Sequence, residues 1–579
     1  MSSSIEHIRH SFAHLLAAAV GELYPDAKNT IGPAIDNGFY YDFEFREGKA
    51  PSDKDLKDIE KRMRKILPTW KGFEKISVTA DEAKRRFAEN PYKIELINEI
   101  VSKGEEVTLY QSGDFIDLCR GGHAEIRDMK SDAFKLSRVA GAYWRGDEKK
   151  TMLTRIYGLA FASKEELESY EAMIAEAKKR DHKILGPELD LFTFSDLVGP
   201  GLPLWTPRGT TVRNLLDEFV WSLRSMRGYE RVEIPHITKK DLYVTSGHWE
   251  KYQNDLFKIT TREGHEFAMK PMNCPHHTQI FARKPWSYRE LPQRYANTTT
   301  CYRDEQSGEL SGLSRVRAFA QDDAHVFCRM SQVKDEFLKI WDIVHEFYPA
   351  FGFDLKVRLS RHDPDHPEKY LGDTALWAFS EKLLADIIAE KKVDAIDGKG
   401  EAAFYGPKLD FMTKDALGRE WQVATIQLDL NMPKRFGLEC TNEKGEREGV
   451  VMIHAAIMGS IERFLSILIE HTAGNLPFWL SPTQVKVVPV REHHEDKARE
   501  VAKALETRGL RVDLDLSAQG FGKKVREAKT LKIPYTIIIG DKDIEAQAVT
   551  LESRDHGQVG QLTLDSVLTR LSQENTRRA

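Results

Sequence analysis

Residues 301–325, CYRDEQSGELSGLSRVRAFAQDDAH, form the stretch that decides the interpretation of the fold. Arg303 and Glu305 stand two residues apart and so share one face of a predicted strand, and a turn rich in Gly and Ser follows. Arg315 and Arg317 are likewise two apart, on the strand that returns. Such a hairpin can hold a triphosphate through bidentate guanidinium contacts while its carboxylate binds an amino group. The pattern also fits a solvated hairpin joined by salt bridges.

Three candidate metal ligands lie far apart in the sequence: Cys274 in KPMNCPHH, His325 in AFAQDDAHVF and His454 in VMIHAAIMGS. One thiolate and two imidazoles are the ligand set of a zinc site with an open fourth position. Their spacing excludes a zinc finger, whose ligands come in short C-x2-4-C and H-x3-5-H pairs. Because a lone Cys or His in an apolar stretch is more often a core residue, the assignment depends on the neighbouring motifs.

The composition describes a protein of several domains. A chain of 579 residues, 41% hydrophobic and 30% charged, is too long for one core and has the balance of a globular protein. Five widely spaced cysteines predict reduced thiols and a cytoplasmic location. No apolar run approaches the roughly 20 residues that span a bilayer, and no targeting peptide is predicted. A net charge of −5 gives no general attraction to nucleic acid, so RNA binding requires local basic patches and no DNA partner is expected.

Four segments differ in their pattern. Residues 1–163 combine an amphipathic helix that begins near Ser4 with strand-like runs such as GFYYDFEF, and residues 164–185 predict a charged linker helix. Residues 186–480 contain strand-like runs separated by turns, which favours an antiparallel sheet. Residues 481–579 alternate strands and helices, as a small α/β domain does. The expected fold class is a multidomain α+β protein.

At this point the motifs carry a resemblance. Pro235 in RVEIPHI, the YRDE segment with Arg303, and the Gly-x-x-x-Arg that ends at Arg463 resemble the three signature motifs of class II aminoacyl-tRNA synthetases. The runs SGHWEKY, MKPMNCP, RVRAFAQDDAH, FYGPKLDF and GSIERF are similar to the threonyl-tRNA synthetase family in particular, in the correct order along essentially the whole chain. The resemblance implies an editing domain, a catalytic domain with six or seven antiparallel strands, and an anticodon-binding domain. It also implies ATP with Mg²⁺, L-threonine and tRNA(Thr) as partners, and a homodimer formed partly through the first motif.

The same resemblance implies roles for individual residues. One zinc ion per chain is held by Cys274, His325 and His454. Arg303 contacts the α-phosphate of ATP. Other members of the implied sites are Arg315 and Arg463 toward the β/γ end, Glu305, Phe319 and Gln422 for ATP, Gln321, Asp323, Tyr405 and Gln427 for threonine, Lys408 for catalysis, and His248 for transfer to the tRNA ribose.

A zinc ion suits threonine for a physical reason. Valine is nearly isosteric with threonine, and an apolar pocket separates such pairs by only about 10²-fold. An open zinc position can bind the amine and β-hydroxyl of threonine together while Asp323 accepts the hydroxyl proton, so valine leaves both groups unsatisfied. Serine lacks only a methyl group, a difference worth about 1–3 kcal/mol. The ligase therefore needs a second site that removes serine.

Candidates for this second site lie in the first domain. His10 and His14 are four residues apart on one helix face, and DLCRGGH presents Cys119 and His123, again four apart. By themselves these residues could form a second zinc site or be structural histidines. RHSFAHLL with DLCRGGH resembles the editing domain of threonyl-tRNA synthetases, which hydrolyses Ser-tRNA without needing a bound metal. Three further positions match that site: Tyr41, Lys93 and Asp117.

The chain departs from the family pattern at several points. His276 stands beside Cys274 where the family has Gly, and a fourth ligand there would close the zinc site, so we expect the His276 side chain to point elsewhere. Ala455 replaces an expected Arg, while Asp543 and Glu552 replace Glu and Arg on the predicted anticodon-reading surface. The chain also begins almost at the editing helix, without the ubiquitin-like domain with which many members begin.

Two other functions remain open at this stage. The chain could be a hydrolase that only edits, with an inactive synthetase body, or a non-catalytic RNA-binding regulator that kept the fold. The intact Arg303, Arg463 and zinc-ligand set argue against the first. Exchange of pyrophosphate into ATP, dependent on an amino acid, separates the ligase from both alternatives.

Overall fold

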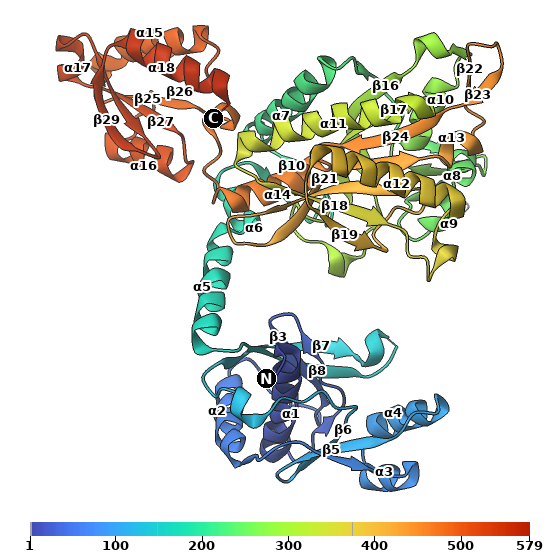
Figure 1. The fold of residues 1–579 in the computed structure, drawn as a ribbon. Helices are drawn as coiled ribbons and strands as arrows, with labels where there is room; N and C mark the ends of the chain where they lie inside the picture. The colour runs from blue at the N-terminus through green and yellow to red at the C-terminus, as the bar shows by residue number, and fades with distance from the viewer. Residues whose placement is uncertain (1–2, 148, 373, 579) are drawn as a thin grey trace. The chain divides into compact units, whose positions relative to one another are not determined.

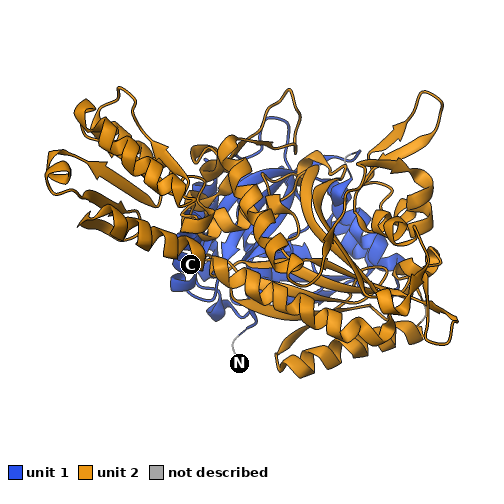
Figure 2. Ribbon diagram, turned by 90° about the horizontal axis from the view of Figure 1, so that it is seen from above, with its two compact units in different colours: residues 1–175 blue, residues 176–579 orange. Residues whose placement is uncertain are grey.

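The computed structural model describes residues 3–147, 149–372 and 374–578. The chain divides into two compact units, residues 1–175 and 176–579, each of which is described by itself (Figures 1 and 2). The unit boundary falls within α5 (Lys164–Arg180), the charged helix that the sequence predicts between two domains. Within the described residues, no helix combines the length and apolar character needed to cross a membrane.

The first unit combines two antiparallel sheets with helices. Its elements before α5 are α1 (Ile5–Leu23), β1 (Lys28–Asn29), β2 (Ala34–Ile35), β3 (Gly38–Glu44), α2 (Leu56–Ile66), β4 (Glu74–Ser77), α3 (Ala80–Arg86), α4 (Pro91–Ser102), β5 (Thr108–Ser112), β6 (Phe115–Leu118), β7 (Phe134–Tyr143) and β8 (Met152–Ala160). One sheet has the order β1-β3-β8-β7 with β2 beside β3, and the other has the order β4-β5-β6. α1 begins where the Ser4 hydroxyl accepts a hydrogen bond from the backbone N–H of His7. Its apolar face packs against β3 and β8.

The second unit contains an eight-stranded sheet. In spatial order its strands are β11 (Glu230–Arg231), β16 (Gln293–Tyr302), β17 (Ala318–Cys328), β24 (Val451–Ala456), β21 (Glu420–Asp429), β20 (Lys408–Lys414), β18 (Leu355–Arg361) and β19 (Ala395–Lys399). Neighbouring strands are antiparallel except at the edges, where β11 pairs with β16 and β19 with β18 in parallel. The six central strands, from β16 to β18, are therefore antiparallel as the resemblance implies, and one short parallel strand is added at each edge.

Helices contribute to the large apolar core of this sheet. They include α7 (Pro207–Ser225), α11 (Val333–Phe347), α12 (Thr374–Lys391) and α14 (Ile461–His471). α14 lies beside the short helix α6 (His182–Glu188), which follows α5 directly (Figure 1). A hydroxyl again defines the helix start, because Ser460 accepts a hydrogen bond from the backbone N–H of Arg463 at 3.2 Å.

The C-terminal part forms a separate five-stranded sheet. Its strands follow the order β26 (Val512–Leu514), β25 (Val485–Pro489), β27 (Tyr535–Ile539), β28 (Val549–Ser553) and β29 (Gly557–Leu562). Four α-helices of the described residues accompany them: α15 (Glu495–Thr507), α16 (Phe521–Thr530), α17 (Asp541–Glu545) and α18 (Leu564–Arg577). The first three strands are parallel, as strand–helix alternation predicts, whereas β28 and β29 add an antiparallel pair that the sequence did not reveal.

Candidate functional site

One face of the eight-stranded sheet gathers most of the predicted residues. Along β17, Ala324 and Val326 belong to the apolar core, so the alternate residues Asp323 and His325 point to the opposite face. The same alternation on β24, β21 and β20, whose core residues include Ile453, Ile426 and Leu409, brings three more side chains to that face. These are His454, Gln427 and Lys408.

Cys274, His325 and His454 converge on one point. Cys274 is the first residue of α10 (Cys274–Phe281), and His325 lies directly opposite His454 in the β17–β24 ladder. One ligand atom from each residue lies within 4.8 Å of the other two, and all three residues are buried. Nε2 of His325 is 3.1 Å from Nδ1 of His454. This donor set fits a zinc ion with one open position.

The second ring nitrogen of both His325 and His454 also has a hydrogen-bonding partner. Nε2 of His454 is 3.1 Å from Oδ2 of Asp429, and Nδ1 of His325 is 2.8 Å from Nδ1 of His277. Because a carboxylate only accepts, His454 carries its proton on Nε2 and turns the Nδ1 lone pair toward His325. Metal-binding histidines are oriented in this manner through their second nitrogen. Sequence reasoning missed Asp429 and His277, since nothing in their local pattern separates them from other polar residues.

Burial controls the protonation of this group. It raises the pKa of the Cys274 thiol well above its usual value and lowers the pKa of His325 well below its usual value. Without a cation, both side chains are therefore neutral. A buried thiolate needs a compensating positive charge, so metal binding releases the thiol proton.

Two neighbouring histidines do not join the ligand set. Nε2 of His276 is 2.5 Å from the Thr238 hydroxyl, so its side chain points away from Cys274, as expected. His248 is fully buried, with Nδ1 2.8 Å from the Ser246 hydroxyl and Nε2 3.7 Å from the Cys274 sulfur. Burial lowers the pKa of His248 to about 3, so this imidazole is neutral at physiological pH.

The predicted threonine-binding residues surround the same point. Oδ2 of Asp323 accepts a hydrogen bond from the Asn273 amide at 3.0 Å, and burial raises the pKa of Asp323 to about 6. The Tyr405 ring stacks on His454 at 4.9 Å, and its hydroxyl donates to Gln427. Gln321 has a buried side-chain oxygen with no hydrogen-bond partner among the described residues. Such an oxygen is satisfied when a polar ligand arrives.

The arginine-rich hairpin differs from the sequence prediction. β16 ends at Tyr302 and β17 begins at Ala318, so Arg303, Glu305, Arg315 and Arg317 lie in the connecting loop and not on strand faces. The loop departs from a ladder because Gly312 adopts a φ of +50° and turns the chain. Arg315 pairs with Glu305 at 2.7 Å, which is the salt-bridged arrangement considered as the alternative.

Positive charge nevertheless remains available beside this loop. The Arg303 guanidinium lies over the Phe319 ring at 5.2 Å, and its Nε is buried with no hydrogen-bond partner among the described residues. Arg463 stands in the first turn of α14. Burial lowers the pKa of Arg463, and the charge of Arg315 lowers it further. Because the charge of Arg315 acts on Arg463, these two guanidinium groups favour an anion between them, such as a phosphate.

Lys408 and Gln422 meet at a buried carboxylate that the sequence analysis did not identify. Nζ of Lys408 is 2.9 Å from Asp410, and the Gln422 amide donates to Asp410 at 2.8 Å. Arg358 donates to both Asp410 and Gln422 at 3.0 Å. The network fixes the orientation of Lys408 and Gln422 but occupies part of their hydrogen-bonding capacity.

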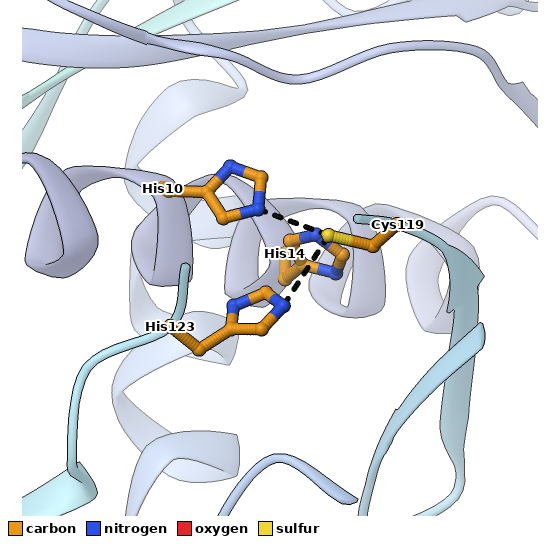
Figure 3. A group of neighbouring side chains, drawn as sticks. All are labelled: His10, His14, Cys119 and His123. Carbon is orange, nitrogen blue, oxygen red and sulfur yellow. Dashed lines mark hydrogen bonds between the residues drawn. The ribbon is translucent and has the colours of Figure 1, made fainter. Parts of the chain in front are cut away.

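A second cluster forms in the first unit (Figure 3). His10 and His14 extend from α1, and Cys119 and His123 follow β6. Nε2 of His10 is 3.1 Å from the Cys119 sulfur, which is 3.4 Å from Nε2 of His123. Ligand atoms of all four side chains lie within 4.8 Å of one another. The predicted convergence of these two pairs is confirmed.

The other three predicted residues form a buried triad in the same pocket. Nζ of Lys93 is 2.5 Å from Asp117 and 3.2 Å from the Tyr41 hydroxyl, which itself donates to Asp117. These residues line a cavity of about 400 Å³ together with His10, His14 and Cys119. Burial raises the pKa of Cys119 to about 11 and lowers the pKa of His123 to about 2, so the four-residue cluster is neutral.

Two supporting residues of this pocket were not predicted. The Asn29 amide donates to Tyr41 at 3.2 Å and to Asp117 at 3.3 Å. The His123 ring stacks on Phe73 at 4.1 Å. Both belong to segments whose local sequence gives no chemical signal, so only the tertiary fold identifies them.

Comparison with known proteins places this geometry in context. Residues 257–472 match the family model "tRNA synthetase class II core domain (G, H, P, S and T)", and residues 484–574 match "Anticodon binding domain". A threonine–tRNA ligase of Porphyromonas gingivalis is 48% identical over 556 residues, covering 95% of this chain and 85% of the relative. One of Rubrobacter xylanophilus is 48% identical over 554 residues, covering 95% and 86%.

Solved structures agree at the level of the fold. A structure described as the RNA binding domain of threonyl-tRNA synthetase from Cryptosporidium parvum has a TM-score of 0.64 and 38% identity, covering 68% of this chain and 98% of that one. Prolyl-tRNA synthetase from the same organism has a TM-score of 0.54 and 17% identity, covering 68% and 77%, a likeness of fold alone.

Proposed function

Since the chain belongs to the threonyl-tRNA synthetase family and joins threonine to tRNA, we propose that it selects threonine with a zinc ion and removes serine at a second site. The observation that carries this proposal is the convergence of Cys274, His325 and His454 beside Asp323. When bound, the ion supplies an open coordination position for the amine and β-hydroxyl of threonine.

Protein groups around that position complete the selection. Asp323, held by Asn273, accepts the hydroxyl proton of threonine. Tyr405 covers His454 and, with Gln427, closes the pocket around the side chain. Valine has no hydroxyl and would leave the buried Asp323 without its partner, a cost that an apolar pocket cannot impose.

Adenylate formation uses the arginines beside the loop between β16 and β17. Arg303 binds the α-phosphate of ATP, and Arg315 with Arg463 binds toward the β/γ end, where Mg²⁺ accompanies the nucleotide. Phe319 supports the Arg303 guanidinium and Glu305 anchors Arg315. Lys408 and Gln422, held by Asp410, face the adenylate. His248, whose Nε2 lies 3.7 Å from the Cys274 sulfur, takes part in the transfer to the tRNA ribose.

Serine is removed in the pocket of the first unit. Lys93 and Asp117, joined to Tyr41, position a water molecule and stabilise the departing ribose oxygen, while the histidine–cysteine cluster orients the ester. In this proposal the site works without a metal, as in the editing domains that the sequence resembles, and Cys119 is a protonated thiol beside the imidazoles of His10 and His123. The pocket must admit serine and exclude the extra methyl group of threonine.

Replacing both His10 and His14 with alanine is expected to leave threonine charging near normal and to let Ser-tRNA accumulate. The reason is that these imidazoles line only the second pocket, whereas threonine activation uses residues of the other unit. Aminoacylation with each amino acid, followed by a deacylation assay with Ser-tRNA, measures both effects. His265→Ala, an exposed histidine of the second unit, is the matched control.

Metal analysis adds an independent readout of this site. One zinc per chain in the wild type and in the His10/His14 double variant is the expected result. Two zinc ions per chain, falling to one in the double variant, would keep the site but contradict the metal-free mechanism. Unchanged Ser-tRNA hydrolysis in the double variant would refute the editing assignment.

We also propose the assembly and the location of the protein. The first signature motif, around α7 and Pro235, is followed by exposed apolar side chains, with Ile237 50% and Val244 47% accessible, and Met226 at the end of α7 is 71% accessible. These exposed apolar side chains near the first motif are the ones that we assign to the homodimer contact. tRNA(Thr) binds through the domain of residues 481–579, and the free thiols of all five cysteines are consistent with a cytoplasmic enzyme.

The domain bounds that fit this proposal follow the sequence prediction. Editing belongs to residues 1–163, the linker to 164–185, and the catalytic domain to 186–480. The linker range contains all of α5 and the start of α6. Limited proteolysis of the purified enzyme, with cleavage in α5, tests these bounds.

A further inference from the structure

His182 is a buried histidine that the proposed mechanism does not use. It is the first residue of α6, is 2% exposed, and contacts two different elements. Its Nδ1 is 2.5 Å from Oε1 of Glu470 on α14. Its Nε2 is 3.0 Å from the backbone nitrogen of Leu313, in the loop between β16 and β17. The ring thus joins the helix that carries Arg463 to the loop that carries Arg315.

The hydrogen bonds define the tautomer of this ring. A backbone N–H can only donate, so Nε2 of His182 holds a lone pair and the proton of the neutral imidazole is on Nδ1, donated to Glu470. Asp181, His182 and Glu470 lie close enough to hold a metal ion. The Nδ1 atom that faces Glu470 carries the ring proton, however, and the lone pair on Nε2 accepts the N–H of Leu313, so the ring offers no lone pair toward the two carboxylates and acts as a bridge.

The loop between β16 and β17 packs so closely on the His182 ring that only glycine fits at position 312. A Cβ atom on Gly312 would lie 2.3 Å from Nε2 of His182, and the φ of +50° at Gly312 also favours glycine. Leu313 is fully buried, and the next residue, Ser314, bonds to the Ser466 hydroxyl of α14 at 2.9 Å. Three successive loop residues are therefore held against α6 and α14 immediately before Arg315.

Glu470 is itself a fixed anchor. Its second carboxylate oxygen is 2.5 Å from Arg419, which also contacts Asp415 at 2.6 Å. Burial alone would raise the pKa of Glu470, but hydrogen bonds from His182 and Arg419 lower it to about 2, so the carboxylate stays charged. Glu470 and Arg463 belong to the same helix, which transmits the position of one to the other.

We propose that His182 is a positioning residue for ATP, which holds Arg315 at the distance from Arg463 that the nucleotide phosphates require. This inference rests on the proposed phosphate-binding role of those two arginines. Arg315 and Arg463 carry like charges, and the carboxylates that pair with Arg315, those of Glu305 and Glu309, belong to its own loop and do not fix that loop to α14. The His182 bridge supplies that link, and the site is then organised before the nucleotide arrives.

His182→Ala is expected to lower kcat/KM for ATP by about 10- to 100-fold in threonine-dependent ATP–pyrophosphate exchange, mainly through a higher KM for ATP. The KM for threonine should stay unchanged, because the threonine pocket does not contact His182. His182→Gln should recover much of the loss, since its amide offers one donor and one acceptor group. His345→Ala, which removes an exposed imidazole bonded to the Trp341 carbonyl at 2.9 Å, is the control and should leave both KM values unchanged.

Arg463→Ala, measured in the same assay, tests the phosphate-binding role of the arginines separately from the positioning role of His182. If Arg463→Ala abolishes exchange but His182→Ala leaves the KM for ATP unchanged, the positioning role is wrong and the phosphate site stands. If Arg463→Ala itself has no effect, the proposed function of the arginines is wrong. Equal rises in the KM for ATP and for threonine in both His182 variants, with an equal fall in Tm, would show that His182 is merely structural.

Discussion

Arg463→Ala is expected to abolish threonine-dependent ATP–pyrophosphate exchange while hydrolysis of Ser-tRNA continues. Arg463 is preorganised in the first turn of α14, and no carboxylate neutralises it among the described residues. Removing a preorganised charge that faces the transition state costs about 10²–10³-fold in rate. Arg303→Ala should behave in the same way, because its guanidinium is fixed over Phe319.

The control for this experiment is Arg447→Ala. Arg447 is 85% exposed, forms its one ion pair among the described residues with Glu439, and lies on β23 (Arg447–Gly449), so both activities should persist. The proposed deacylation site belongs to the other unit, so that activity serves as an internal test of folding. If both arginine variants lost Ser-tRNA hydrolysis to the same extent as exchange, the two-site proposal would be refuted in favour of global unfolding.

Cys274→Ser is expected to remove the zinc and, with it, nearly all activation of threonine. Serine has a similar size but does not provide a thiolate, and the two remaining histidines cannot hold the ion by themselves. Inductively coupled plasma mass spectrometry gives the metal content, and exchange with threonine gives the activity. Because protons compete for the ligands, zinc occupancy of the wild type should also fall at acid pH.

Cys440→Ser provides the matched control for this substitution. Cys440 is also buried but lies on β22 (Glu439–Thr441), where no cluster of metal ligands forms among the described residues. It should keep one zinc per chain and normal exchange. Full zinc content together with full threonine activation in Cys274→Ser would show that the ligand assignment is wrong.

The sequence revealed residues whose chemistry has a recognisable pattern. The pair His10 and His14 share a helix face because of their spacing, and Cys119 and His123 repeat that spacing. Both pairs do meet in the structure. The free thiols were likewise predictable, since the wide spacing of the cysteines is read directly from the sequence.

Other features depend on distant contacts and could not be predicted. Asp429 and His277 orient His454 and His325 only because the sheet and α10 bring them within hydrogen-bond distance of those two rings. His182 forms its hydrogen bonds with Glu470 and Leu313, which are both more than a hundred positions away in the sequence. Arg315 was expected on a strand, but it lies in a loop that turns at Gly312 and contacts α6 and α14, and no local pattern reveals those contacts.

ATP–pyrophosphate exchange by the wild-type enzyme with threonine, serine and valine in turn tests the central claim most directly. We expect strong exchange with threonine, exchange with serine weaker by about 10- to 200-fold because only a methyl contact is lost, and none measurable with valine. This order reflects a pocket that requires both the amine and the hydroxyl. Exchange with valine equal to that with serine, or the absence of exchange with threonine, would contradict the account.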